Sequence, residues 1–164
     1  MRDRTDGYTE FASVIAPRLF RSALLLCGDW QLAEDLVQTT LAKLFVAWKK
    51  ASRADNPEAY ARGVLTKTFL SHQRVRRNSE LPTDQVAERL AEGPDSALRL
   101  DLLAALRDLD KVDRAVVVLR YWEDRTVSET AHHLSMSEAA VKTRASRAMG
   151  KLRVALTASK EASA

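Results

Sequence analysis

Residues 126–153 read TVSETAHHLSMSEAAVKTRASRAMGKLR and decide the fold of the C-terminal half of the chain. Thr126 and Glu129 have the spacing of a capping box, in which each side chain accepts a hydrogen bond from a free N–H at the start of a helix. We therefore expect a short helix over 127–134, a turn at 135–137, and a long helix that Ser137 caps. A small residue at 131, a turn at 135 and an apolar anchor at 141 are the spacing of a helix-turn-helix. Ser135 stands where most such units have glycine, so a positive φ there would strain the turn mildly.

The long helix expected from residue 138 has a narrow apolar side and a cationic surround. At about 100° per residue, the inward side carries Val141, Ala145, Ala148 and Leu152. The outward side carries Ala139, Thr143, Ser146, Arg147 and Gly150, one flank carries Lys142 and Arg153, and the other carries Arg144 and Lys151.

Such a helix suits the major groove of DNA. Short or forked polar side chains can reach base edges, while cations on both flanks reach the phosphates. The alternative is an ordinary solvated face, but such a face would mix acids among the cations. None occurs between Glu138 and Glu161.

The composition favours an all-α protein. Among 164 residues there are only 5 Gly and 4 Pro, and 46% of the residues are hydrophobic, which is enough to bury a core. Cys27 is the single cysteine, which excludes an internal disulfide and a multi-thiolate zinc site, and we expect it to be a buried, inert thiol. No apolar run approaches the roughly 20 residues of a membrane span, and the start of the chain lacks the apolar core of a signal peptide. We expect a cytoplasmic protein without membrane insertion.

Charge is distributed unevenly along the chain, although the net charge is only +4. Residues 62–78 contain five cations and no acid, whereas residues 79–97 contain five acids and one arginine, together with Pro82, Gly93 and Pro94. We therefore expect two small helical domains, over residues 1–78 and 98–164, joined by a flexible acidic linker over 79–97. A solvated loop inside a single domain is the alternative.

Apolar spacing, caps and breakers predict the remaining helices. In the N-terminal half we expect helices over 8–26, interrupted or kinked near Pro17 and ended by Gly28, over 31–49, and over 57–77 with Asn56 as N-cap. In the C-terminal half we expect helices over 98–108 and over 113–122, the latter with Ala115, Val116, Leu119 and Trp122 facing inward.

Three arginines, Arg74, Arg76 and Arg77, end the expected helix over 57–77. A basic helix end complements the helix dipole and needs no ligand. Because a second basic module follows across the linker, the cluster also fits a second contact with nucleic acid.

Four stretches together resemble the extracytoplasmic-function (ECF) sigma factors of bacterial RNA polymerase, most closely their actinobacterial sigma-E-like branch. They are GDWQLAEDLVQ at 28–38, NPEAY at 56–60, VVLRYW at 117–122, and the helix-turn-helix with VKTR at 141–144. The resemblance implies a sigma factor that binds core polymerase and directs promoter-specific transcription initiation. Region 2 would bind the β′ coiled coil and open the minus-ten element, and region 4 would read the minus-thirty-five element and touch the β flap.

The resemblance also assigns site residues. Polymerase contact falls on Asp35 and Gln38, although solubility alone explains these two polar residues equally well. Minus-thirty-five contacts fall on Lys142, Thr143, Arg144, Ser146, Arg147 and Lys151, and minus-ten contacts on Arg53, Asp55, Asn56, Arg62, Lys67, Ser71, Arg74, Arg76 and Arg77.

Two features of the expected minus-ten region bear on how it would recognise DNA. Lys67 stands where the family commonly has asparagine, and a cation lacks the paired donor and acceptor of an amide. The loop over 49–56 matches the segment that captures a flipped base, but it offers donors and no aromatic platform, so capture would rest on hydrogen bonding.

The resemblance also makes an anti-sigma factor a candidate partner. In the family the acidic linker passes through the polymerase channel, but a linker that only increases solubility would explain its acidic composition equally well. We expect no catalytic activity, small-molecule substrate, cofactor or metal. His132 and His133 are adjacent and face about 100° apart, which favours helix surface over a metal clamp, and Trp30, Trp48 and Trp122 fit core or edge anchors.

Two other classes of function compete with a sigma factor. An autonomous transcription regulator would combine the helix-turn-helix with a sensing domain, but no ligand pocket or phosphoacceptor is evident in the sequence. A helical scaffold that binds only protein leaves the cationic flanks of the long helix unexplained.

Overall fold

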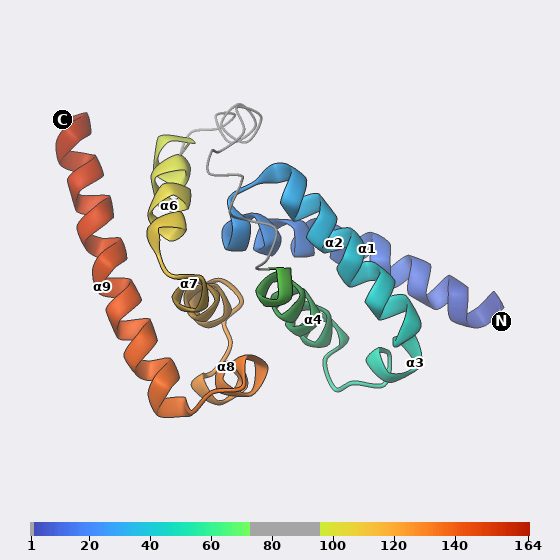
Figure 1. The fold of residues 1–164 in the computed structure, drawn as a ribbon. Coiled ribbons are helices and arrows are strands. Elements are labelled where there is room, and N and C mark those ends of the chain that lie inside the picture. The colour runs from blue at the N-terminus through green and yellow to red at the C-terminus, as the bar shows by residue number, and fades with distance from the viewer. Residues whose placement is uncertain (1, 73–95) are drawn as a thin grey trace.

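The computed structural model describes residues 2–72 and 96–164, which form helices joined by short turns (Figure 1). The N-terminal half contains α1 (Arg2–Cys27), α2 (Trp30–Val46), α3 (Trp48–Ala51) and α4 (Pro57–Ser71). The C-terminal half contains α6 (Ser96–Asp108), α7 (Lys111–Val117), the π-helical turn η2 (Val118–Trp122), α8 (Val127–Leu134) and α9 (Glu138–Ser163). The all-α prediction is confirmed for these residues.

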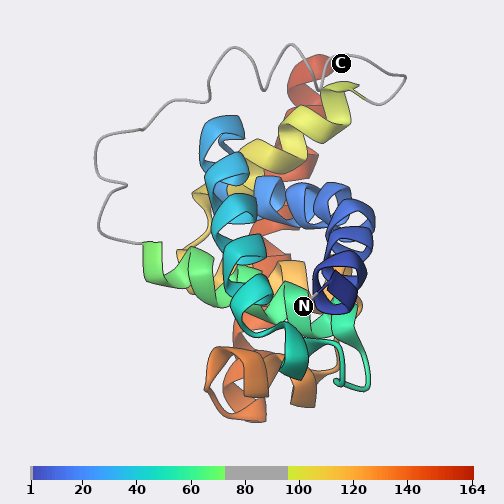
Figure 2. The ribbon, with the colours of Figure 1, turned by 90° about the vertical axis from the view of Figure 1, so that its right-hand side faces the viewer.

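Helix α4 begins after its predicted cap, Asn56, whereas α1 begins at Arg2, before the expected start at residue 8, and the cap of α2 at Asp29 was not predicted. Asp29 accepts a hydrogen bond from Leu32 N at 2.9 Å at the start of α2, and Asn56 accepts one from Ala59 N at 3.0 Å at the start of α4. Pro17 lies inside a continuous α1, whose axis changes direction along its length, so a bend replaces an interruption (Figure 2).

The helix predicted over 31–49 is divided in two. It turns at Ala47, and this turn lets Trp48 pack on Tyr8 and Phe11 with ring centroids 5.6 and 5.1 Å away.

The predicted inward position of Trp122 is wrong. The backbone after α7 widens into a π turn, in which Glu123 N donates to Val118 O at 2.9 Å. The wider turn changes which side chains face inward. As a result Trp122 is 54% exposed, whereas Glu123 is 5% exposed.

The helix-turn-helix is confirmed. The capping box of Thr126 and Glu129 is complete, and Ser137 accepts a hydrogen bond from Ala140 N at 3.1 Å at the start of α9. Ser135 adopts the left-handed conformation, with φ 53° and ψ 48°. The inward stripe is buried as predicted: Val141, Ala145, Ala148 and Leu152.

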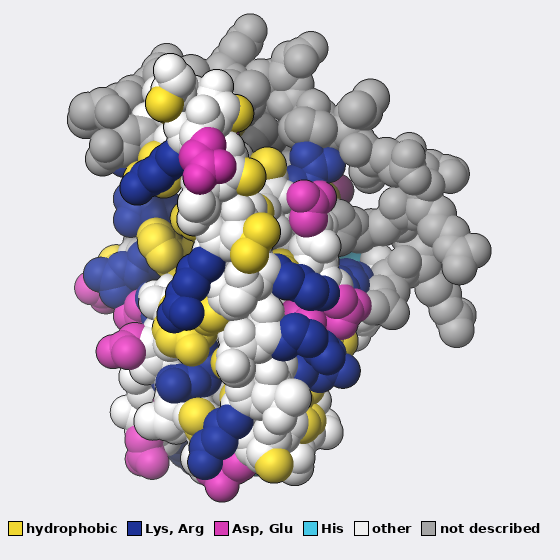
Figure 3. All heavy atoms as spheres, turned by 90° about the vertical axis from the view of Figure 1, so that its left-hand side faces the viewer, with side chains coloured by type: hydrophobic (Ala, Val, Ile, Leu, Met, Phe, Trp, Pro, Cys, Tyr) yellow, Lys and Arg dark blue, Asp and Glu magenta, His cyan; other side chains and the backbone are white. Residues whose placement is uncertain are grey.

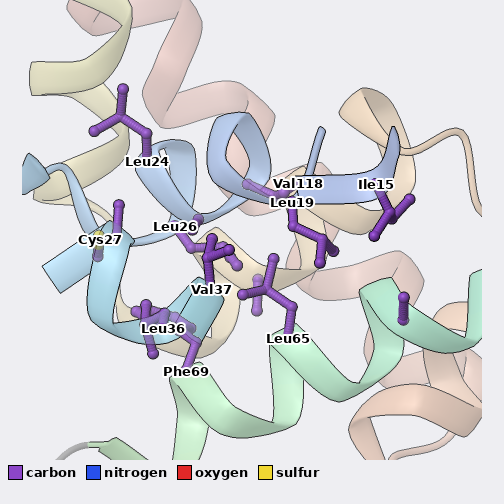
Figure 4. Close-up of a cluster of buried hydrophobic side chains, with 14 of the residues drawn as sticks. Ile15, Leu19, Leu24, Leu26, Cys27, Leu36, Val37, Leu65, Phe69 and Val118 are labelled. Atoms are coloured by element: carbon purple, nitrogen blue, oxygen red, sulfur yellow. The ribbon is translucent and has the colours of Figure 1, made fainter. Parts of the chain in front are cut away.

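The two halves share one hydrophobic core. Leu103, Ala115 and Val118 of the C-terminal half are buried in the same cluster as residues of α1, α2 and α4, and Figure 4 shows Val118 beside these helices. In α7, Arg114 Nη1 donates to Leu26 O at 2.7 Å and Lys111 Nζ donates to Phe69 O at 3.2 Å. Cations of α7 therefore cap the C-terminal ends of α1 and α4, where helix carbonyls lack partners.

Several expectations fall outside the described residues: most of the acidic linker, and Arg74, Arg76 and Arg77. Residues 96 and 97, placed in that linker, belong to α6.

Candidate nucleic-acid interface

Helix α9 lies on α6, α7 and α8, at the side of the molecule away from α2 (Figure 1). Its outward residues Thr143, Ser146 and Gly150 are exposed, as predicted. In Figure 3, which faces this side, lysine and arginine side chains lie on both sides of a strip of uncharged atoms. The face has the arrangement expected of a helix that enters the major groove.

One flank of α9 is paired with acids from α7. Arg144 Nη1 donates to Asp113 Oδ1 at 2.7 Å and to Asp110 Oδ2 at 3.3 Å, and Arg147 Nη2 donates to Asp113 Oδ2 at 2.9 Å. The hydrogen bond to Asp113 raises the pKa of Arg144. Arg147 was expected to face outward; its side chain is 51% exposed, but its guanidinium is held against Asp113.

The other flank of α9 lies beside η2. Lys142, Ser146 and Arg153 line a hollow with Arg120 and the exposed Tyr121. Lys142 and Arg153 are thus exposed cations on this flank, and Lys151 is an exposed cation on the flank of Arg144.

A second cationic surface is formed by α3 and the loop before α4. Lys49, Lys50, Arg53 and Ala54 line a hollow of about 600 Å³ together with Tyr60. Sequence reasoning missed Tyr60, because only the loop over 49–56 was searched for an aromatic ring. Asp55 and Asn56 are exposed, and Asn56 also caps α4.

Helix α4 carries the other described minus-ten candidates, and they differ in access. Lys67 and Ser71 are exposed, although Ser71 Oγ donates to Lys67 O at 2.8 Å. Arg62 is 20% exposed and donates to Glu58 Oε1 at 2.7 Å.

Helix α8 packs against α4 at Gly63. A Cβ at residue 63 would lie 2.6 Å from the His133 ring, so glycine permits this close approach. The expectation that both histidines lie on the helix surface is therefore wrong for His133, which is partly buried between the halves, whereas His132 is exposed.

Two titratable groups, the buried Glu123 and the partly buried His133, lie between the halves. Burial raises the pKa of Glu123, against the attraction of Arg62 and Arg125. Burial also lowers the pKa of His133, and the nearby cations Arg125 and Lys67 lower it further.

The two candidates for polymerase contact lie on α2. Asp35 and Gln38 are exposed there, where a partner can reach both.

Within residues 2–72 and 96–164, no group of three His, Cys, Asp or Glu residues could hold a metal ion. In the same part of the chain, no helix is both long and apolar enough to cross a bilayer.

Comparison with known proteins agrees with this arrangement. Residues 13–79 match the family model "Sigma-70 region 2", and residues 105–154 match "Sigma-70, region 4". The RNA polymerase sigma-E factor of Streptomyces coelicolor is 35% identical over 156 residues, which cover 92% of this chain and 86% of that protein. The ECF RNA polymerase sigma factor SigL of Mycobacterium tuberculosis is 33% identical over 91% of this chain and 86% of that protein.

A solved structure has the same fold. The sigma factor RpoE of Bartonella quintana, in complex with the anti-sigma factor NepR, superposes with a TM-score of 0.71 at 21% identity, over 92% of this chain and 97% of that chain. The chain therefore belongs to the RNA polymerase sigma factors, which direct promoter-specific initiation of transcription. Within them it belongs to the ECF group.

Proposed function

We propose that this protein directs core RNA polymerase to promoters through two DNA-contacting surfaces, one on α9 and one on α3 and α4. Residues 13–79 and 105–154 match regions 2 and 4 of sigma factors, which supports one surface in each half. In this proposal the protein acts in the cytoplasm and catalyses no reaction itself.

The outward face of α9 carries the proposal. Its aliphatic stripe is buried against its own half, and Thr143 and Ser146 are exposed between cations. In the minus-thirty-five element, these hydroxyls and Arg147 would contact base edges. Lys142, Lys151 and Arg153 would contact phosphates and fix the register of the helix.

The surface on α3 and α4 would act at the minus-ten element. Lys49, Lys50 and Arg53 would attract the phosphates of an opened strand. The ring of Tyr60, which is partly buried against the core and also lines the hollow, would be the platform for an unpaired base. Lys67 adds a cation on the exposed side of α4. Capture of a base would then use stacking as well as hydrogen bonding.

Core polymerase would bind α2 of the N-terminal half. Asp35 and Gln38 are both exposed on this helix, and α2 lies away from α9 (Figure 1). Polymerase contact there leaves the DNA-reading face of α9 accessible. By the same proposal, the β flap contacts the C-terminal half.

The decisive experiment is in vitro transcription with purified core polymerase and a pool of genomic promoters. We expect discrete start sites that core polymerase alone does not produce, with shared sequence elements upstream. No start sites above those of core polymerase would refute the proposal. Tight, site-specific binding to duplex DNA without polymerase would instead favour an autonomous regulator.

A further inference from the structure

A buried carboxylate lies directly behind the DNA-reading face of α9. Asp113 of α7 is 1% exposed. Its Oδ1 accepts hydrogen bonds from Arg144 Nη1 at 2.7 Å and Arg147 Nη2 at 3.0 Å, and its Oδ2 accepts from Arg147 Nη2 at 2.9 Å and Nε at 3.3 Å. A buried charge is tolerated when it is paired and hydrogen-bonded, so the two arginines explain how Asp113 can lie here.

The contact with Asp113 occupies one edge of the Arg147 guanidinium. A guanidinium has five N–H donors in one plane, and Asp113 takes the edge formed by Nε and Nη2. Nη2 contacts both oxygens of Asp113 on this edge, which leaves the end formed by Nη1 and the outer hydrogen of Nη2, on a side chain that is 51% exposed. Two parallel donors at that end match the O6 and N7 acceptors of guanine in the major groove.

The charge balance around Arg147 favours a base over a phosphate. Arg144 and Arg147 face two carboxylates, those of Asp113 and Asp110. Their positive charge is therefore largely neutralised, whereas Lys142 and Arg153 lie on the opposite flank of α9, and Lys151 lies one turn beyond Arg147 on the same flank. Holding the guanidinium in place also reduces the rotamer freedom that an arginine loses on binding.

From this geometry we infer that Asp113 is a positioning residue that presents Arg147 to a guanine in the upstream promoter element. The inference rests on the proposed function, because it requires α9 to enter the major groove. It adds a residue of α7 to the determinants of sequence preference, and it names the base.

The test uses the full-length protein with core polymerase and a promoter library randomised across the upstream element. Arg147→Ala is expected to lower the preference for guanine at one position about tenfold. Asp113→Asn is expected to lower it about threefold or more at the same position and to leave other positions unchanged. The double variant should match Arg147→Ala, because Asp113 acts through Arg147.

Asp110→Asn is the matched control. This variant makes the same chemical change on a carboxylate that contacts Arg144, at 3.3 Å, but does not contact Arg147. The Asp110 side chain is 58% exposed. We expect the Asp110→Asn variant to keep the guanine preference. Because preference is a ratio between promoters, a lower folded fraction of a variant does not change it. If Asp113→Asn does not fold, Asp113→Glu, which displaces the carboxylate, should give the same local loss.

The outcomes separate the two levels of proposal. If the wild-type protein gives no promoter-specific starts, the proposed function fails. If it does, the inference alone is overturned by a full guanine preference in the Asp113 variants, by a loss equal at all positions, or by the absence of any guanine preference that depends on Arg147.

Discussion

Helices α4 and α9 both carry DNA-contacting candidates, yet their surroundings differ. Helix α9 packs within its own half and exposes its outward face along its length. Helix α4 is held on one side by α7 and α8 of the other half, through Lys111 at Phe69 and His133 at Gly63. The outward face of α9 is therefore accessible to a partner in this arrangement, whereas one side of α4 is covered by the other half.

Removing Arg114 should have the largest effect, because this cation of α7 caps the C-terminal end of α1 and so holds the two halves together. Its side chain is 5% exposed and donates to three backbone carbonyls, those of Leu26, Arg107 and Leu109. Arg114→Ala is expected to lower the free energy of unfolding by about 3 kcal/mol, since buried acceptors lose charged donors. Urea denaturation measures this, with the exposed Arg99→Ala as control. A loss no larger than that of the control would contradict the capping role.

Tyr60 tests the surface on α3 and α4. Tyr60→Ala is expected to slow promoter opening about tenfold, because stacking of one base on an aromatic ring contributes about 1–3 kcal/mol. Tyr60→Phe keeps the ring and should open promoters at nearly the wild-type rate. Permanganate footprinting of unpaired thymines follows the opening. Equal behaviour of the two variants would exclude stacking.

Lys151 tests the exposed face of α9, the helix that the other half does not cover. Lys151→Ala should weaken promoter binding about threefold for all sequences alike and should reduce the slope of log affinity against log salt by about 1. Fluorescence anisotropy of the holoenzyme at several salt concentrations measures both. A loss confined to particular sequences would instead assign Lys151 to base reading.

His133 should give the smallest effect, on pH dependence. Its folded-state pKa is lowered by burial, so the unfolded chain binds more protons below the ordinary value of 6.5. Its contribution to stability is therefore complete above about pH 6.5 and is lost as pH falls toward the folded pKa. His133→Gln should reduce the drop in thermal midpoint between pH 7.5 and 5.5. Glu123, whose raised pKa acts in the opposite direction, is unchanged in both proteins, and an identical drop would contradict the prediction.

Features encoded within a few residues could be predicted from the sequence. The capping box at Thr126, the caps at Asn56 and Ser137, and the buried stripe of α9 depend on neighbours within one or two helical turns. The motif commonly has glycine at the turn, and Ser135 adopts the left-handed conformation there.

Features that depend on distant partners were missed. Asp113 precedes Arg144 and Arg147 by 31 and 34 residues, so the cations of α9 looked free of acids when that helix was read alone. The π turn at 118–122 has no evident local signal, and it moved Trp122 outward. The packing of Gly63 on His133 joins two halves whose composition suggested separate domains.

The core shared between the halves also limits how tightly a partner can bind. Any ligand that needs α4 uncovered binds only the open fraction of molecules, and its apparent dissociation constant rises by the inverse of that fraction. Separation of the halves would expose Leu103, Ala115 and Val118 to water, and this unfavourable exposure would keep that fraction small. Substitutions that weaken this contact without unfolding either half would therefore increase promoter activity at limiting protein concentration.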